Sequence, residues 1–496
     1  MILSPRSIAL GLLFVIAACL PAAEIPKPPD WSKVRNEVAR MRNGTPRVRN
    51  PDSAAETKKN QDSIKVVAQY LAFTIATAPY NGEPVVRVDK SVAIPEGTMS
   101  GLMTEAEFYC NLSPTSGNMG KLTVEQTEYG AEMGAAMADA AKVVLENSVR
   151  PIERMNAVRL LALTARMPAP ALAPVFVQTI VNPKVSDAEK LYAFQGLRNL
   201  MEQTDLVDAT RNVIRDVNVL GQISEALAGY IVQDRGRPDD REKAVIEFVR
   251  RHAIAALAQF KDGVIRKPSK DLISRPSWTL MRVIASDPTV SPPFTIQEKV
   301  EAAIGFCQQK VDPDMNLDVA TYNLAGVDVP GAIVQFSTSA NLDVLRATKT
   351  KEQEGTLTAS HWKILAARLS YALAVWRESC KTLPAARYPQ YVVTFATTSI
   401  AILTPIEKEG GGASTGKEVA ALNTWTADYR PKAWMENPPK AAQLYNDDPK
   451  SLLPFYVAPP KVGDPKLTTP PVKSPDPKVV DPKAAGPKKG PLPPGK

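Results

Sequence analysis

The glycine-rich segment Glu409–Lys417 is the first place in the chain where residue types and spacing suggest chemistry. Gly411, Gly416 and Lys417 nearly match a P-loop, which binds phosphates through backbone N–H groups and a lysine. The motif also needs a Ser or Thr hydroxyl for Mg²⁺ after the lysine. Glu418 stands at that position and would place a negative charge there. We therefore expect a flexible surface loop rather than a nucleotide site.

A second candidate is a run of oxygen-bearing side chains at alternate positions, as at the start of a calcium loop. The run consists of Asp312, Asp314, Asn316 and Asp318. Leu317 replaces the glycine of an EF-hand loop, and Asn323 replaces its bidentate glutamate. The sequence favours a turn that connects two helices and caps their ends. A weak extracellular calcium site stays open as the alternative.

The chain has two histidines, His252 and His361, which lie far apart in helix-like stretches. This number is too small for a His-rich metal centre, and no Gly-x-Ser-x-Gly elbow accompanies them. We expect His252 on a charged helix face and His361 to pack or cap at a helix start. Carboxylate pairs of the kind used in glycoside hydrolysis are set by spatial distance, so the sequence leaves them open. No catalytic, cofactor-binding or metal-binding residue is assigned.

Four cysteines are present, and Cys110, Cys307 and Cys380 lie beyond the N-terminal segment. Three is an odd number, so at most one internal disulfide can form and the chain is no disulfide scaffold. Cys307 and Cys380 lie on helix-like stretches, where a buried thiol behaves as a small apolar residue. Buried free thiols are the expectation, with a disulfide among these three left open.

Residues 1–23 have a short basic start, an apolar run from Ile8 to Leu20 and a small-residue exit. This pattern resembles a secretory signal peptide and is too short for a membrane-spanning helix of about 20 residues. Cleavage before Glu24 is one expectation. The other follows from Ile16–Cys19, which resembles a bacterial lipobox in which Cys19 is lipidated. The sequence thus predicts export to the periplasm, the cell envelope or the medium, with a membrane-anchored lipoprotein as the alternative.

The formal net charge of +8 is concentrated at the C-terminus. Residues 458–496 hold eight lysines and three aspartates, and 12 of the 44 prolines. Once Arg6 of the signal is also set aside, the remaining chain carries about +2, which argues against a basic nucleic-acid groove on a folded face. We expect residues 458–496 to be a disordered tail with polyproline II character.

Between signal and tail the sequence divides into a polar basic leader, residues 24–60, and an α-helical domain, residues 61–457. The leader is either loosely ordered or contains one short helix around Trp31–Met41. Helix is expected from about Asp62 to Pro79, and an irregular region over Tyr80–Gly120 that has room for a short strand near Val85–Val92. A further short helix is expected over Glu418–Tyr429.

The middle of the chain contains a recurring pattern of a charged helix start followed by Ala, Val or Ile and Leu at helical spacing. Its instances begin near Arg154, Ser186, Asp239 and Thr295, with a fifth around Leu365–Trp376. Proline-marked second helices are expected between them, at Ala171–Ile180 and Ser277–Ile284, and Thr123–Gln126 is a candidate capping box.

This pattern resembles the first helix of a HEAT-type repeat over about residues 123–400. Ala157 and Ala193 are 36 residues apart, whereas later instances are unevenly spaced and HEAT repeats run about 40–47 residues. The sequence therefore predicts an all-α fold, either an irregular α-solenoid or an array of HEAT-like helical hairpins.

Stacked amphipathic helices with few chemical groups favour a non-enzymatic, exported scaffold that binds a protein partner. An envelope or extracellular hydrolase with unidentified carboxylates is the first alternative. The second is binding of an acidic polymer through the lysine-rich tail, while a nucleic-acid partner is disfavoured. No cofactor is predicted.

Overall fold

The computed structural model describes residues 24–78, 99–112, 122–202, 213–284, 287, 289–311, 359–383 and 390–409. The signal segment with Cys19, the strand near Val85–Val92, the calcium-like run 312–323, the near P-loop, the helix over 418–429 and the tail lie outside these ranges. The described residues form an all-α fold, as the sequence predicts, with one small β-hairpin.

The elements run along the chain in the following order. They are α2 (Arg35–Arg42), α3 (Ala54–Thr77), α4 (Met99–Cys110), α5 (Val124–Asn147), α6 (Pro151–Thr164), the 3₁₀ turn η1 (Pro170–Leu172), α7 (Ala173–Val181), α8 (Asp187–Glu202), α9 (Val217–Ile231), α10 (Asp240–Leu257), β1 (Ile265–Arg266), β2 (Leu272–Ser274), α11 (Pro276–Ile284), α12 (Ile296–Gln308), α15 (Ala359–Cys380) and α16 (Gln390–Glu409).

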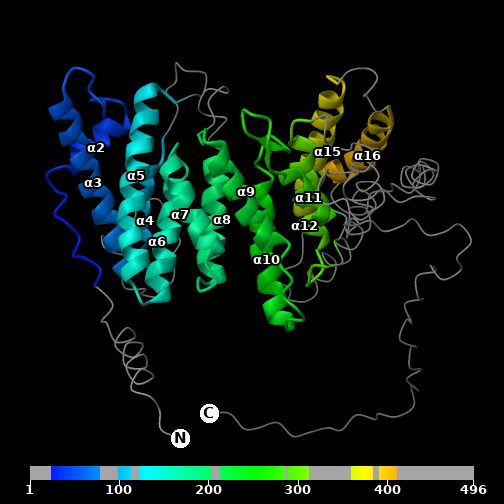
Figure 1. The fold of residues 1–496 in the computed structure, drawn as a ribbon, viewed down its shortest axis with the longest axis horizontal. Helices are drawn as coiled ribbons and strands as arrows, with labels where there is room; N and C mark the ends of the chain where they lie inside the picture. The colour runs from blue at the N-terminus through cyan, green and yellow to red at the C-terminus, as the bar shows by residue number, and fades with distance from the viewer. Residues whose placement is uncertain are drawn as a thin grey trace, which may run out of the picture.

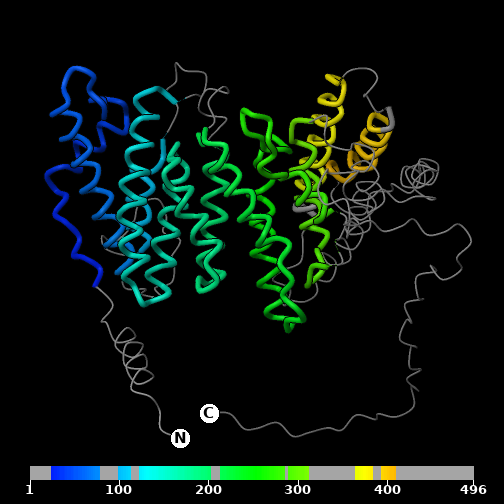
Figure 2. The backbone as a smooth tube through the Cα atoms, in the orientation of Figure 1, coloured from blue at the N-terminus to red at the C-terminus, as the bar shows by residue number. Residues whose placement is uncertain are grey.

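These helices stand side by side in sequence order, from α2 at one end to α16 at the other (Figures 1 and 2). Their contacts define two layers. In one layer, α3 packs on α6, α6 on α8, α8 on α10, α10 on α12 and α12 on α15. In the other, α5 contacts η1, followed by α7, α9 and α11. Each layer covers the apolar stripe of the other, so one continuous core runs through the array.

Side-chain caps fix where several of these helices begin. Thr123 and Thr295 each form a reciprocal capping box, with Gln126 and Glu298 respectively, as the sequence predicts. Ser186 and Glu189 exchange the same bonds before α8, where the Glu189 amide donates to Ser186 Oγ and Glu189 Oε2 accepts from the Ser186 amide. The predicted second helices are confirmed as α7 and α11.

The basic leader belongs to the folded array. It contains the predicted short helix, α2, and Trp31 stacks on Tyr70 of α3 with ring centroids 4.1 Å apart. Arg49 pairs with Glu132 of α5 at 2.7 Å, and Arg47 pairs with Glu125 of the same helix. Helix α3 begins at Ala54, capped by Ser53, rather than near Asp62, because the serine hydroxyl accepts from the Glu56 amide about three turns ahead of the apolar stripe that starts at Ile64.

The prediction of an irregular region over Tyr80–Gly120 is wrong for Met99–Cys110, where α4 forms. Leu102, Ala106 and Tyr109 are buried at helical spacing, and α4 packs against α3 and α6. The glycine and serine content of this stretch conceals the helix, because burial against two neighbouring helices outweighs weak local propensity.

Two Arg–Glu pairs, one half-buried and one fully buried, tie successive helices of the first layer together. Arg154 of α6 donates to Glu189 at the start of α8 at 3.0 Å. Arg250 of α10 donates to Glu298 at the start of α12 at 2.6 and 3.0 Å. Both glutamates are the third residues of capping boxes, so each carboxylate caps its own helix and accepts from the helix before it.

Candidate functional site

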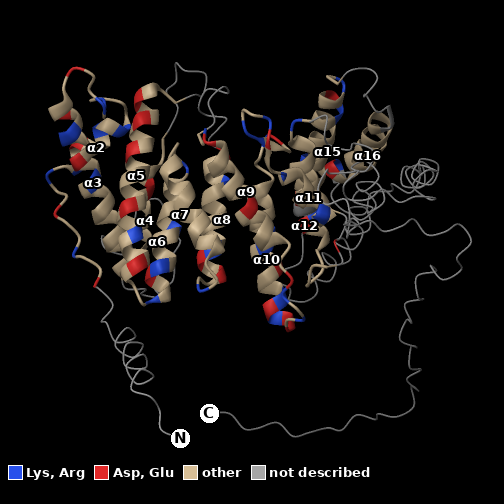
Figure 3. Ribbon diagram, in the orientation of Figure 1, with Lys and Arg blue, Asp and Glu red and all other residues tan. Residues whose placement is uncertain are grey.

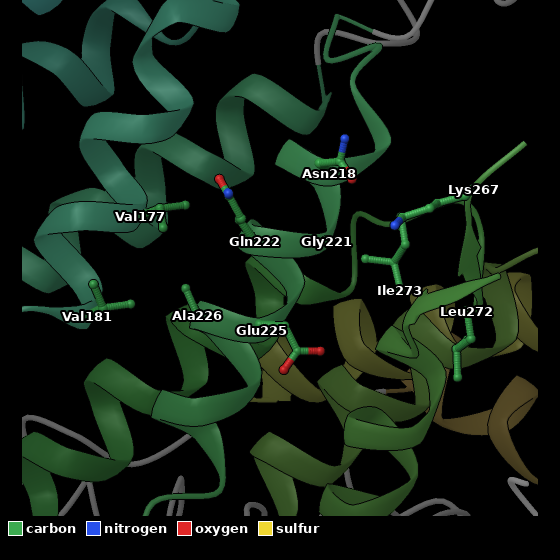
Figure 4. Close-up of a pocket in the computed structure, with 10 residues that line it drawn as sticks. All are labelled: Val177, Val181, Asn218, Gly221, Gln222, Glu225, Ala226, Lys267, Leu272 and Ile273. Carbon is green, nitrogen blue, oxygen red and sulfur yellow. The ribbon is translucent and has the colours of Figure 1, made fainter. Parts of the chain in front are cut away.

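A surface groove lies in the second layer, between α7, α9 and the β-hairpin, and we refer to it as the α7–α9 groove. Its volume is about 610 Å³. The lining residues are Val177 and Val181 of α7, Asn218, Gly221, Gln222, Glu225 and Ala226 of α9, and Lys267, Leu272 and Ile273 of the hairpin (Figure 4).

The floor of the groove is the outward face of α9. Asn218, Gln222 and Glu225 lie on this face at helical spacing and are exposed, whereas Ile223 and Leu227 of the opposite face are buried in the core. The helix is therefore amphipathic, and its polar stripe is left open to solvent by the two walls on either side (Figure 4).

The hairpin that forms one wall is held close to α9. The hydroxyls of Ser224 on α9 and Ser274 on β2 share a buried hydrogen bond of 2.7 Å. Beside it, a Cβ added at Gly221 would lie 2.3 Å from Ile273 Cγ2. Only glycine allows this approach, because any larger residue at position 221 would push the hairpin away from α9.

The walls present apolar side chains to solvent. Val181 at the end of α7 is 59% exposed, and Leu272 of β2 is 38% exposed. Figure 4 places these two residues on opposite sides of α9. Exposed apolar side chains gathered around a concavity are typical of a binding surface, because their coverage by a partner removes apolar area from water.

Four polar side chains of the lining are available to a ligand. Asn218, Gln222, Glu225 and Lys267 make no side-chain hydrogen bond or ion pair with any other residue in the described ranges. Lys267 reaches from the hairpin back toward Gly221, and Gln222 points toward α7 (Figure 4). The groove thus offers two amides, one carboxylate and one ammonium group beside its apolar walls.

The residues singled out by sequence do not meet in this groove. His252 lies on α10, edge-on to the ring of Phe248 with centroids 5.0 Å apart. Burial, and then the Arg251 and Arg198 guanidinium groups, lower the pKa of His252, so the imidazole is neutral at pH 7. His361 lies in the first turns of α15, and its side chain is outside the described set.

The three cysteines are buried and free, as the sequence predicts. Cys110 lies 3.4 Å from the hydroxyl of Thr164 on α6, whereas Cys307 and Cys380 lie in the core of α12 and α15. Burial raises the pKa of Cys110 to about 11 and that of Cys380 to about 12, and it raises the pKa of Cys307 as well. These thiols are therefore protonated and poor nucleophiles at neutral pH.

Within the described ranges, no three His, Cys, Asp or Glu side chains are grouped so that they could hold a metal ion. No described helix is both long and apolar enough to span a bilayer. Lys and Arg are intermixed with Asp and Glu over the helices rather than gathered on one face (Figure 3).

Sequence reasoning missed both α9 and the hairpin. The available signal was the polar stripe of Asn218, Gln222 and Glu225 between apolar residues at helical spacing. Such a stripe is indistinguishable from an ordinary solvated face until the walls beside it are known.

Comparison of the chain with family models, with characterised proteins and with solved structures finds no match.

Proposed function

We propose that this chain is an exported, non-enzymatic helical scaffold of the cell envelope that binds a protein partner through the α7–α9 groove. The observation that carries the proposal is a groove with exposed apolar walls and unpaired polar groups on a rigid two-layer helical array. Interfaces combine an apolar centre with polar groups that fix orientation, and both are present here.

The content of the groove favours binding over catalysis. Among the described residues, its lining holds one carboxylate, Glu225, and no histidine, cysteine or second acid. Hydrolysis by paired carboxylates needs two such groups that flank the bond to be cleaved. The hydrolase alternative therefore gains no support from this groove.

The HEAT-like pairing of helices forms part of the same proposal. One interaction that occurs twice supports this pairing: an arginine of one first-layer helix donates to the capping-box glutamate of the next. The two instances are Arg154–Glu189 and Arg250–Glu298. Export through residues 1–23 completes the proposal, with cleavage before Glu24 or, as the alternative, a lipid tether at Cys19. Mass spectrometry of the mature N-terminus distinguishes the two.

A pull-down from envelope fractions with matched variants tests the groove. We expect the unaltered chain to retain a partner, and Val181→Lys or Leu272→Lys to reduce its retention by about tenfold or more, because a charge replaces exposed apolar area. Val149→Lys is the matched control, since Val149 is 72% exposed and lies outside the groove.

Deletion of residues 458–496 distinguishes binding through the groove from binding through the tail. Retention that survives this deletion and is lost in the two groove variants supports the proposal. If retention of the partner requires the tail and is unchanged in the groove variants, the acidic-polymer alternative replaces the proposal.

A further inference from the structure

The two amides on the floor of the α7–α9 groove indicate what kind of partner fits it. Asn218 and Gln222 are exposed, unpaired within the described ranges and one helical turn apart on α9. Each side-chain amide carries both a donor and an acceptor. In an extended peptide the N–H and the C=O of one residue point to the same side, so a carboxamide can pair with both groups of that residue at once.

Asn218 and Gln222 are spaced along α9 much as alternate residues are along an extended backbone. Four residues of α-helix advance about 6 Å along the axis. Two residues of an extended strand advance about 6.6–6.8 Å, and alternate residues present their backbone groups on the same side. A peptide lying along α9 would therefore bring every second residue to an amide of the floor.

The charged residues of the groove also favour a peptide as its ligand. Glu225 and Lys267 have opposite signs, and neither is paired with another described residue. An acidic polymer would meet an unpaired carboxylate at the floor, and a basic surface would meet Lys267. A segment of polypeptide with side chains of both signs satisfies both groups.

The open floor argues against a small ligand. Pockets for small molecules enclose about 70–90% of the ligand surface. Here Asn218, Gln222 and Glu225 stay exposed along the outward face of α9, so the groove is open along its length. This shape suits a chain that enters at one end and leaves at the other.

We propose that the α7–α9 groove binds an extended peptide segment of its partner, with the Asn218 and Gln222 amides paired to the peptide main chain. Apolar side chains of the peptide contact Val177 and Val181 on one wall and Leu272 on the other. The inference rests on the proposed function and specifies the form of the partner at that same groove.

Random-sequence peptides displayed on phage and selected against the purified chain test this proposal. We expect the selected peptides to lack proline at the paired positions and to carry apolar residues beside them. The double variant Asn218→Leu/Gln222→Leu should weaken a selected synthetic peptide by about tenfold or more, because peptide N–H and C=O groups lose their partners. Gln178→Leu, an exposed amide of α7 outside the lining, should leave its affinity unchanged.

N-methylation of single peptide bonds supplies a readout that a general loss of fit would not give. N-methylation of the two peptide residues that pair with Asn218 and Gln222 should abolish the contribution of these amides to peptide affinity. N-methylation of the peptide residue between these two should have little effect. Failure to select any peptide, or equal affinity of the double variant, overturns the peptide inference. Loss of the natural partner in Val181→Lys would still leave the groove as its binding site, so the two proposals fail separately.

Discussion

At the scale of single residues, burial decides the chemistry of the groups that looked reactive in the sequence. Cys110, Cys307 and Cys380 are free, but the core raises the pKa of each thiol, and the surroundings of His252 lower the pKa of its imidazole. All four side chains are therefore uncharged at pH 7. Their roles are packing roles, because desolvation disfavours the ionised forms that nucleophilic or acid–base chemistry needs.

The raised thiol pKa values predict a loss of stability at alkaline pH. An unfolded thiol ionises near pH 8.5, whereas the folded thiols of Cys110 and Cys380 have pKa values of about 11 and 12. The folded state is therefore fully favoured below about pH 8.5. Above it, the unfolding free energy should fall by up to about 1.4 kcal/mol per pH unit for each buried thiol.

Denaturant titrations between pH 7 and the alkaline range measure this slope, and a variant with all three cysteines replaced by alanine should show a smaller one. Alkylation gives a second measurement. The native chain should resist iodoacetamide at neutral pH and become labelled on unfolding. Equal labelling rates in the folded and unfolded chain would contradict the buried, protonated state.

At the scale of elements, a carboxylate that both caps one helix and accepts from another sets how neighbouring helices meet. Glu298 accepts from the backbone of Thr295 and from Arg250, whose guanidinium also donates to the Pro292 carbonyl at 2.7 Å. Arg250 and Glu298 are both fully buried. Removal of one charge leaves the other without compensation in a region of low dielectric.

We therefore expect Glu298→Gln to lower the unfolding free energy by about 3–5 kcal/mol, although glutamine keeps the capping bond. Glu146→Gln is the matched control. It removes the acid of the exposed pair Lys142–Glu146 and should cost about 0–0.5 kcal/mol. Denaturant midpoints of the two variants measure the difference, and a loss below about 1 kcal/mol for Glu298→Gln would show that the pair adds little.

The uneven spacing of the helical pattern also has its cause at this scale. The two equivalent Arg–Glu pairs span 35 residues at Arg154–Glu189 and 48 residues at Arg250–Glu298. Helix α7 and its turns fill the first interval, whereas the β-hairpin and α11 fill the second. The longer interval therefore includes the hairpin wall of the groove, and the shorter interval includes its α7 wall.

At the scale of the whole molecule, each helix contacts its neighbours in the array and few distant elements. Helices α3 and α5 pack at one end and α12, α15 and α16 at the other, with α6 to α11 between them. In such an array stability is approximately a sum of local terms and interfaces between neighbours. A defect should then weaken the part of the array where it lies.

Hydrogen exchange followed by mass spectrometry of the Glu298→Gln variant tests whether a defect weakens only its own part of the array. We expect backbone amides of α10 and α12 to lose protection strongly, and those of α3 and α5 to change little, because α6 to α9 separate the two regions in the described array. A uniform loss of protection over all described helices would instead indicate a single cooperative unit.

Local sequence patterns are enough to predict the helical class and several helix boundaries. Capping boxes at Thr123 and Thr295, and the second helices α7 and α11, follow from local patterns, because a cap or an apolar stripe acts within a turn or two of the chain.

The position of the groove, in contrast, depends on how distant elements pack against each other. Asn218 and Gln222 form an ordinary polar stripe in the sequence, and their value as binding groups depends on α7 and the hairpin, whose lining residues lie 37 or more positions away from Asn218. The same holds for Arg250, a charged residue by type that the fold buries against Glu298. Packing between distant elements determines which side chains are exposed, which are paired and where the surface is concave. The order of residues along the chain does not contain this information.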